Sequence, residues 1–260
     1  MIDQEKKIVA VTSGLEGHVA VVTGGVSGIG RATARLFAVH GARVVIFDIQ
    51  ESRGKEVVEE LRATGATASF HACDVTNGSQ VEETFADVLR DFGQIDVLVN
   101  VVGGSRLAPF WELTEKDWDD GLTFNLKSQF LCCRAVVPHM MGRRTGAIVN
   151  LSSGQGATPA PQRAPYSAAK AGVIGMTRTL AAEMAPYGVR VNAVAPSATN
   201  TERARSIFTA EEWVKQNAIQ PFGHVAEPED QAEAIVFLAS PRARHMTGQV
   251  LFVNGGTFMP

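Results

Sequence analysis

The sequence is poor in cysteine and lacks any long apolar run. Its 260 residues include only three cysteines, none in the Cys-x-x-Cys spacing of a zinc site. The six histidines show no His-Glu-x-x-His or similar ligand spacing either. No window approaches the roughly 18 apolar residues of a membrane span, and the acidic N-terminal residues do not resemble a secretory signal. We therefore expect no catalytic metal and a reducing, cytoplasmic setting.

An excess of charge of one sign is also missing. The 24 basic and 27 acidic side chains give a net charge of −3, with no long run of either sign. This balance argues against nucleic acid or an anionic membrane as the main partner. With 45% hydrophobic residues, the chain can bury a substantial core as one large domain. We expect that domain to cover residues 17–260, after an N-terminal extension over residues 1–16.

Short apolar runs alternate with longer segments of helical period along most of the chain. This alternation is typical of a parallel sheet covered by helices on both faces. Gly41 supplies a stop signal for the first helix, and a capping-box-like Thr-Glu-Lys-Asp begins a long helix at Thr114. The predicted strands cover residues 19–23, 43–47, 66–72, 95–99, 147–151, 189–195 and 249–253, and the predicted helices cover 29–40, 51–63, 79–92, 114–140, 164–185 and 229–239.

These seven strands predict an α/β fold of the Rossmann type, a doubly wound parallel sheet in a single domain. Ligands bind such sheets at the carboxyl ends of the strands. The irregular stretch 197–221 is long for a loop inside a compact domain, and loops of this length tend to be functional. Because it carries Ile207, Phe208 and Trp213 among polar residues, we expect a substrate lid; a plain surface excursion is the alternative.

The first strand runs into a glycine-rich turn that opens a helix. The turn, residues 23–30, has the spacing Thr-Gly-x-x-x-Gly-x-Gly. Glycines allow close approach of the backbone to a ligand, and the helix N-terminus offers free N–H groups to a pyrophosphate. A glycine turn between a strand and a helix predicts a dinucleotide site rather than a purely structural turn. The cofactor contacts expected here are Gly24, Ser27, Gly28, Ile29 and Gly30.

The end of the second predicted strand indicates which dinucleotide binds. Asp48 lies eighteen residues after Gly30, where a carboxylate can accept hydrogen bonds from the adenosine ribose and repels a 2′-phosphate. Ser27 occupies the position in the turn where a basic side chain would be needed for that phosphate. Arg31 and Arg43 are expected on an exposed helix face and at the wrong end of a strand. The prediction is NAD rather than NADP.

Tyr166 and Lys170 are four residues apart, so they share one face if the segment is helical. An ammonium beside a phenol stabilises the phenolate, which can exchange a proton with an alcohol. Lowering a tyrosine pKa from about 10 to about 7 takes roughly 4 kcal/mol. A lysine about 4 Å away supplies on the order of 4 kcal/mol at an effective dielectric near 20. Such a pair also arises by accident on amphipathic helices, so its meaning depends on a hydride carrier and a matching serine.

The chain resembles the short-chain dehydrogenase/reductase family over residues 17–256. Each matching motif is weak alone, but their order and spacing together are highly specific. The motifs are residues 23–30, Cys73-Asp74-Val75, Val97-Leu98-Val99-Asn100, Phe124-Asn125-Leu126, residues 148–153, Tyr166-Ser167-Ala168-Ala169-Lys170, residues 190–196, Pro228-Glu229-Asp230 and Thr247-Gly248-Gln249.

The resemblance implies a catalytic tetrad of Asn125, Ser153, Tyr166 and Lys170. Tyr166 is expected to act as general base and acid, while Ser153 donates a hydrogen bond to the substrate oxygen. Lys170 is expected to anchor the nicotinamide ribose as well, and Asn125 to hold a water that relays protons to it. Ser152 competes with Ser153, but the family's thirteen-residue interval to Tyr166 selects Ser153. Further cofactor contacts implied by the resemblance are Asp74, Val75, Asn100, Pro196, Thr199 and Thr201.

Two motifs depart from the family pattern. The usual Asn-Asn-Ala-Gly after the fourth strand is Asn100-Val101-Val102-Gly103, and the usual Pro-Gly is Pro196-Ser197. Both changes lie beside the expected pocket, where they can tune the choice of substrate. Arg106 and Arg163 near the pocket entrance raise the hypothesis of a substrate with a carboxylate or another anion, but solvated surface arginines are the preferred interpretation. The substrate contacts we expect are Arg106, Gln155, Ser197, Phe208 and Trp213.

We therefore expect an NAD-dependent enzyme that interconverts a secondary alcohol or diol and a ketone. An NADP-dependent ketoacyl-type reductase is one alternative, which Asp48 disfavours. A nucleotide-binding redox sensor without turnover is another, which a complete tetrad disfavours. The resemblance also implies a homotetramer that pairs the helices predicted at 114–140 and 164–185 and the terminal segment 229–253.

Overall fold

The apolar runs of the sequence form the central sheet of the protein. A computed structural model describes residues 13–259. Within them, seven parallel strands run in the order β3-β2-β1-β4-β5-β6-β7, which confirms the predicted doubly wound sheet. The predicted strand ends are correct to within two residues. The strands are β1 Val19–Thr23, β2 Arg43–Asp48, β3 Ala68–Ala72, β4 Val97–Asn100, β5 Gly146–Leu151, β6 Val189–Pro196 and β7 Val250–Val253.

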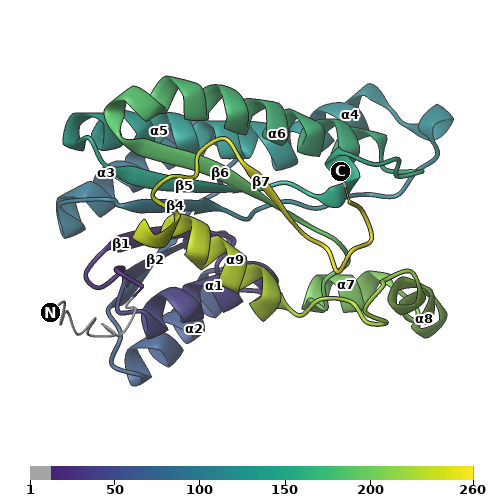
Figure 1. Cartoon of the computed structure of the whole chain (residues 1–260), viewed down its shortest axis with the longest axis horizontal. Coiled ribbons are helices and arrows are strands. Elements are labelled where there is room, and N and C mark those ends of the chain that lie inside the picture. The colour runs from purple at the N-terminus through teal and green to yellow at the C-terminus, as the bar shows by residue number, and fades with distance from the viewer. Residues whose placement is uncertain (1–12, 260) are drawn as a thin grey trace, which may run out of the picture.

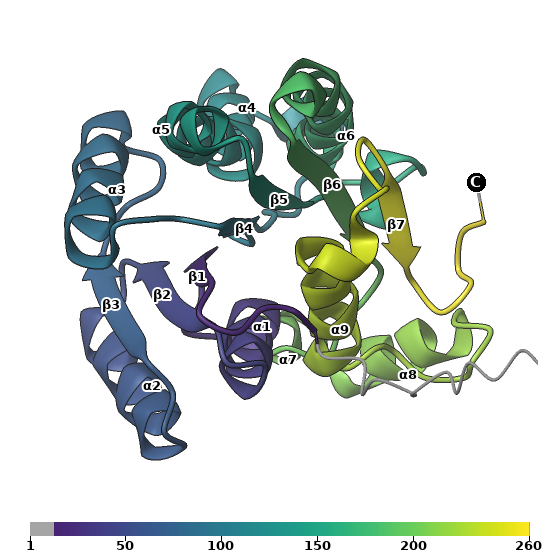
Figure 2. The same ribbon diagram turned by 60° about the vertical axis from the view of Figure 1, so that its left-hand side comes forward.

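Helices cover both faces of this sheet, as Figures 1 and 2 show. Because successive side chains of a strand point to opposite faces, Ala20 and Val22 of β1 pack in one layer and Val19 and Val21 in the other. All four are fully buried, as expected for a parallel strand covered on both sides. The first layer contains α1 (Gly28–Val39), α2 (Glu51–Ala63) and α9 (Pro228–Ala239), and the second contains α3 (Gly78–Phe92), α5 (Ser128–Arg143) and α6 (Ala164–Met184).

The long helix expected over residues 114–140 is interrupted by a π-helical turn. The predicted capping box at Thr114 is formed, since its side chain and that of Asp117 exchange hydrogen bonds with the backbone. The π turn was not predicted, and such turns occur frequently at functional sites. It carries Asn125, whose side chain is fully buried. The three consecutive segments are α4 (Glu115–Leu122), the π turn (Thr123–Lys127) and α5.

All seven strands end at the same edge of the sheet, since all are parallel. The segment predicted as a lid follows β6 at this edge and contains two short helices, α7 (Glu202–Ile207) and α8 (Ala210–Ala218). Both lie beyond the tips of β6 and β7 in Figure 1. Sequence positions far apart therefore meet at the carboxyl edge of the sheet.

The predicted N-terminal extension, residues 1–16, lies mostly outside the described residues. Among residues 13–259, no helix is long and apolar enough to cross a membrane. The same residues contain no group of three or more His, Cys, Asp or Glu side chains arranged to hold a metal ion.

Gly54 allows α2 to pack closely on β3. A Cβ at this position would lie 2.1 Å from Cδ2 of Phe70, so the helix or the ring must move. We expect Gly54→Ala to lower the free energy of unfolding by about 1–3 kcal/mol, as measured by urea denaturation. Gly142→Ala is the control, because a Cβ there meets nothing within 4 Å; this change should be neutral or stabilise by up to about 1 kcal/mol. Equal effects of the two substitutions would contradict the packing argument.

Candidate active site

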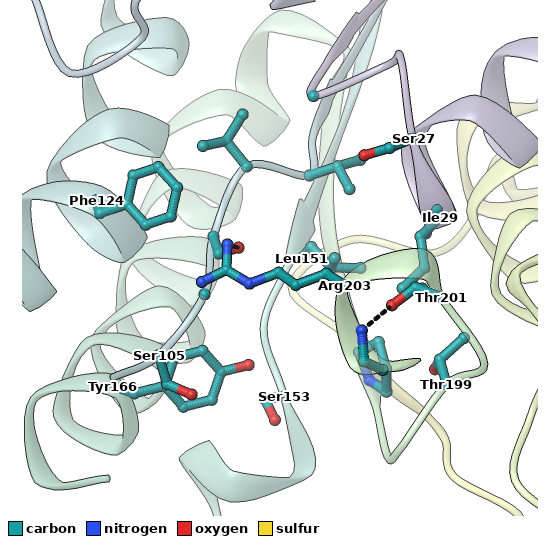
Figure 3. Close-up of a pocket in the computed structure, with 18 of the residues that line it drawn as sticks. Ser27, Ile29, Ser105, Phe124, Leu151, Ser153, Tyr166, Thr199, Thr201 and Arg203 are labelled. Atoms are coloured by element: carbon teal, nitrogen blue, oxygen red, sulfur yellow. Dashed lines mark hydrogen bonds between the residues drawn. The ribbon is translucent and has the colours of Figure 1, made fainter. Parts of the chain in front are cut away.

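A cavity of about 490 Å³ opens at the carboxyl ends of β1, β2, β4, β5 and β6 (Figure 3). Segments from the glycine turn, the strand ends, α6 and α7 all contribute to its lining. Most of the site residues predicted from the sequence are brought together here. They are Gly24, Ser27, Gly28, Ile29, Asp48, Asp74, Val75, Ser153, Tyr166, Lys170, Pro196, Ser197, Thr199, Thr201 and Phe208.

Three of the expected substrate contacts lie outside the lining. The Arg106 side chain is 72% exposed and forms an ion pair with Asp117. Trp213 packs edge to face on the lining residue Phe208, with ring centroids 5.5 Å apart. Gln155 is half-buried, and its Oε1 has no hydrogen-bond partner among the described residues.

Only glycine fits at key points of the turn after β1. Gly24 has a φ of +68° and Gly28 a φ of +47°, both in the left-handed region. A Cβ at Gly30, which does not itself line the cavity, would lie 2.1 Å from the Gly24 carbonyl oxygen. Ser27 caps α1 without a side-chain hydrogen bond, and the first turn of the helix carries no acidic residue. These features fit a phosphate group at the N-terminus of α1.

Asp48, at the end of β2, lines the part of the cavity away from Tyr166. Its carboxylate accepts a hydrogen bond of 3.0 Å from the backbone N–H of Gln50, which fixes its position at the end of β2. Arg53 on α2 is ion-paired with Glu202 of α7. The hydrogen bond that Arg53 donates to the Glu202 carboxylate raises the pKa of Arg53, and the charge of Asp48 adds to the effect. The guanidinium near Asp48 is thus already neutralised by a carboxylate of the lid.

Ser153 and Tyr166 meet beside the cavity, as Figure 3 shows. Ser153 follows β5 and is 7% exposed, and its hydroxyl lies near enough to the Tyr166 phenol to act against the rise in the pKa of that phenol. Ser152 is oriented differently, because its hydroxyl donates to the carbonyl oxygen of Lys170 at 2.8 Å. The structure therefore brings Ser153, and not Ser152, next to the phenol.

Lys170 is almost completely buried behind Tyr166. Its Nζ donates to the Leu151 carbonyl oxygen at 2.7 Å and lies 5.6 Å from the centroid of the Tyr166 ring. Burial lowers the pKa of Lys170 to about 7. The lysine is therefore only partly charged near neutral pH, unlike the full ammonium assumed in the sequence argument.

The pKa of Tyr166 is raised above its ordinary value, mainly by burial. The hydrogen bond with Ser153 and the positive charges of Arg163 and Arg203 oppose this rise. Lys170 is not among the causes of the shift. In the protein without cofactor the groups that act against this rise are thus a serine and two arginines, and the pKa stays above its ordinary value.

Asn125 fixes the loop that follows β4. Its Nδ2 donates to the carbonyl oxygens of Gly104 and Gly121 at 2.8 and 2.9 Å, and its Oδ1 accepts from the Gly104 N–H at 2.8 Å. A Cβ at Gly103 would lie 2.8 Å from Asn125 Oδ1 and 3.0 Å from Lys170 Nζ. Asn125 therefore does not line the cavity, but its side chain and that of Lys170 meet at the same glycine.

Asn100, expected to contact the cofactor, is also outside the lining. Its side chain points between strands, and Nδ2 donates to Oδ1 of Asn150 at 2.9 Å. Arg203, in contrast, lines the cavity although the sequence did not predict it as a site residue. Its position two residues after Thr201, in the expected lid, was the available signal. Phe124, next to Asn125 in the π turn, was missed as well.

The fold and the site define a Rossmann-type oxidoreductase that uses a nicotinamide cofactor. The sequence profile of a family described as Enoyl-(Acyl carrier protein) reductase matches residues 24–257. Relatives and solved structures match this chain over more than nine-tenths of its length, in sequence and in fold. The chain belongs to the short-chain dehydrogenase/reductase family.

Three relatives illustrate this similarity. The 3-oxoacyl-(acyl-carrier-protein) reductase FabG of Thermotoga maritima is 40% identical over 244 residues, covering 93% of this chain and 98% of that protein. D-threitol dehydrogenase of Mycolicibacterium smegmatis is 38% identical over 242 residues, covering 93% of each. The crystal structure of gox2181 superposes with a TM-score of 0.92 at 36% identity, covering 95% of this chain and 97% of that one.

The buried lysine predicts a pH-dependent stability. The pKa of Lys170 is about 7 in the folded protein, against an ordinary value of 10.5. Between pH 7 and 10.5, therefore, Lys170 is protonated in the unfolded chain and unprotonated in the folded protein. This residue therefore makes the free energy of unfolding rise with pH across that window. We expect the difference between wild type and Lys170→Met to grow by on the order of a few kcal/mol, measured by urea denaturation from about pH 7 to 10.

The control for this experiment is Lys55→Met, since the Lys55 side chain is 67% exposed. This variant should track the wild type across the same pH range. A wild-type minus Lys170→Met difference that stays constant with pH would show that the lysine keeps its ordinary pKa.

Proposed function

We propose that the protein is an NAD-dependent oxidoreductase that interconverts a secondary alcohol, or one hydroxyl of a diol, and a ketone. The observation that carries this proposal is that Ser153 and Tyr166 line the same cavity near one another, with the buried Lys170 behind them. D-threitol dehydrogenase, a relative named for a polyol, supports the alcohol class.

Tyr166 accepts the hydroxyl proton in the oxidation direction and returns it in the reduction direction. Ser153, which lines the same cavity as the phenol, holds the substrate oxygen beside Tyr166. When bound, the nicotinamide supplies the hydride acceptor or donor. Lys170, with a pKa of about 7, can pass protons onward near neutral pH, and Asn125 acts by fixing the neighbouring loop.

The cofactor would lie along the cavity from Asp48 to Tyr166. Asp48 would accept hydrogen bonds from the adenosine ribose, and the N-terminus of α1 would bind the pyrophosphate. Two features favour NAD over NADP: the carboxylate of Asp48, and the ion pair that keeps Arg53 on Glu202. Further contacts in this proposal are Gly24, Ser27, Gly28, Ile29, Asp74, Val75, Pro196, Thr199 and Thr201.

A ketoacyl reductase is the second candidate, supported by the relatives named 3-oxoacyl-(acyl-carrier-protein) reductase. An NADP preference in that case would have to overcome the charge of Asp48. A redox sensor without turnover is less well supported, because Ser153, Tyr166 and Lys170 all reach the same cavity.

We also infer self-association as a homotetramer and a cytoplasmic setting. Trp118 of α4 and Phe130 of α5 are 39% and 46% exposed on the helices that the family pairs, and exposed apolar groups of this kind favour a partner surface. Cys73, Cys132 and Cys133 are buried and unpaired, as expected in a reducing compartment.

Removing the phenol hydroxyl tests the proposed chemistry. We expect Tyr166→Phe to lower kcat by about 100- to 10,000-fold while leaving the affinity for NAD unchanged, because the ring and its packing remain. The assay is the absorbance of NADH formed from a panel of secondary alcohols and diols, with calorimetry for NAD binding. Tyr187→Phe is the control, since this other tyrosine lies outside the cavity lining. Turnover that survives in Tyr166→Phe would refute the proposed role.

The cofactor preference is tested at Asp48. Asp48→Asn removes the charge that repels a 2′-phosphate, so the ratio of kcat/KM with NAD to kcat/KM with NADP should fall by about tenfold or more, equivalent to about 1.4 kcal/mol. Asp74→Asn removes a charge from the same cavity and should leave the ratio unchanged. If wild type already prefers NADP, the assignment of Asp48 is wrong.

A further inference from the structure

Two arginines lie at the Tyr166 end of the cavity, and neither forms an ion pair with any residue in the described part of the chain. Arg163 immediately precedes α6, and its Nη1 donates to Ser105 Oγ at 2.8 Å. Arg203 comes from α7, and Figure 3 shows its side chain extending across the pocket above Tyr166 and Ser105. Guanidinium groups from two separate elements therefore approach the loop after β4.

The two side chains contact neighbouring residues of that loop. A Cβ at Gly104 would lie 2.2 Å from the Arg203 Cζ, so the guanidinium lies directly against the glycine backbone. Arg163 is bonded to the next residue, Ser105. The loop itself is fixed from below by Asn125 through both the N–H and the carbonyl oxygen of Gly104. Both guanidinium groups are thus held against a loop segment that Asn125 keeps in place.

The charges along the cavity are unevenly distributed. Its two carboxylates, Asp48 and Asp74, follow β2 and β3 at the end assigned to adenosine. At the other end, among the described residues, the lining carries Arg163, Arg203 and the partly charged Lys170, and no carboxylate. Arg203 is exposed, but Arg163 is half-buried, and positive charge that is partly removed from water and has no counter-ion is costly. An anion bound at this end would offset that cost.

The pyrophosphate of the cofactor does not account for this excess. It is assigned to the glycine turn and the N-terminus of α1, whereas Arg163 lies at the start of α6, three residues before Tyr166. Both guanidinium groups are near enough to Tyr166 for their charges to lower the pKa of its phenol. An anion that contacts both therefore lies beside the reacting hydroxyl group.

We propose that Arg163 and Arg203 form an anion receptor in the substrate pocket, and that the substrate is a hydroxy acid or the corresponding keto acid. The planar donors of arginine match a carboxylate in pairs of hydrogen bonds. This inference rests on the proposed function for the reaction. Oxidation of a hydroxy acid breaks its carbinol C–H and O–H bonds, with the hydride taken by NAD and the proton by Tyr166. The product is a keto acid whose carboxylate stays on the arginines.

Binding without turnover provides the test. Butanoate and butanamide have the same shape but differ in charge, and calorimetry on the complex of enzyme and NAD measures their affinities. We expect wild type to bind butanoate at least about tenfold more tightly than butanamide. Arg163→Gln and Arg203→Gln should each weaken butanoate binding by about ten- to a hundredfold without changing the weak binding of butanamide.

Arg205→Gln is the matched control, because Arg205 is exposed on the same short helix and donates to Asn200 Oδ1 at 2.8 Å. It should bind butanoate as wild type does. Affinities for NAD are measured for every variant and should change by less than about threefold. Kinetics with short hydroxy acids and their methyl esters should then show the loss in kcat/KM of the arginine variants confined to the acids.

Three outcomes overturn the receptor. They are equal affinity of wild type for butanoate and butanamide, unchanged butanoate binding in both arginine variants, and a loss confined to NAD binding, which would assign the guanidinium groups to the pyrophosphate. These results are independent of the Tyr166→Phe assay. A receptor that binds butanoate in an enzyme with no Tyr166-dependent turnover would leave this inference standing while refuting the proposed reaction.

Discussion

A row of buried hydrogen bonds sets the geometry on which the site depends. Thr23, Asn100 and Asn150 are paired in register across β1, β4 and β5. Asn100 donates to Asn150 at 2.9 Å, and Asn150 donates to Thr177 of α6 at 3.0 Å. All four side chains are at most 1% exposed, and among their polar side-chain atoms Oδ1 of Asn100 alone lacks a partner within the described residues. An unmatched buried polar group costs about 1–3 kcal/mol. A slip of one residue would break the row, so the strand ends and α6 are held in a single alignment.

Burial has opposite effects on the two central groups of the site. It raises the pKa of Tyr166 and lowers that of Lys170, so both are driven toward their neutral forms. A simple Coulomb argument treats the lysine as fully charged, but the low dielectric that strengthens the attraction also discharges the ammonium. Positive charge at Tyr166 then comes from side chains that keep it, since a guanidinium stays protonated in proteins. The arginines thus have an electrostatic role that the Tyr-Lys spacing does not reveal.

The sequence predicted the sheet and most of the cavity lining, because these follow from local patterns. Short apolar runs and the glycine turn locate Ser27 and Asp48, and the helical spacing to Lys170 locates Tyr166. The direction in which a long side chain points depends on its tertiary contacts, which local sequence patterns do not reveal. Arg106 was expected in the pocket but is drawn to Asp117 on α4, while Arg203 reaches across from the lid. The π turn that buries Asn125 was equally hidden, since one extra residue in a helix leaves no compositional mark.

The ion pair between Arg53 and Glu202 joins two parts of the chain 149 residues apart. It connects α2, the helix after Asp48, to α7, and residues that flank these two helices, Gln50 and Thr201, line the cavity. Both partners are partly exposed, at 34% and 45%, so dissolved salt weakens their attraction. Ionic strength therefore acts on how firmly α7 is held against α2.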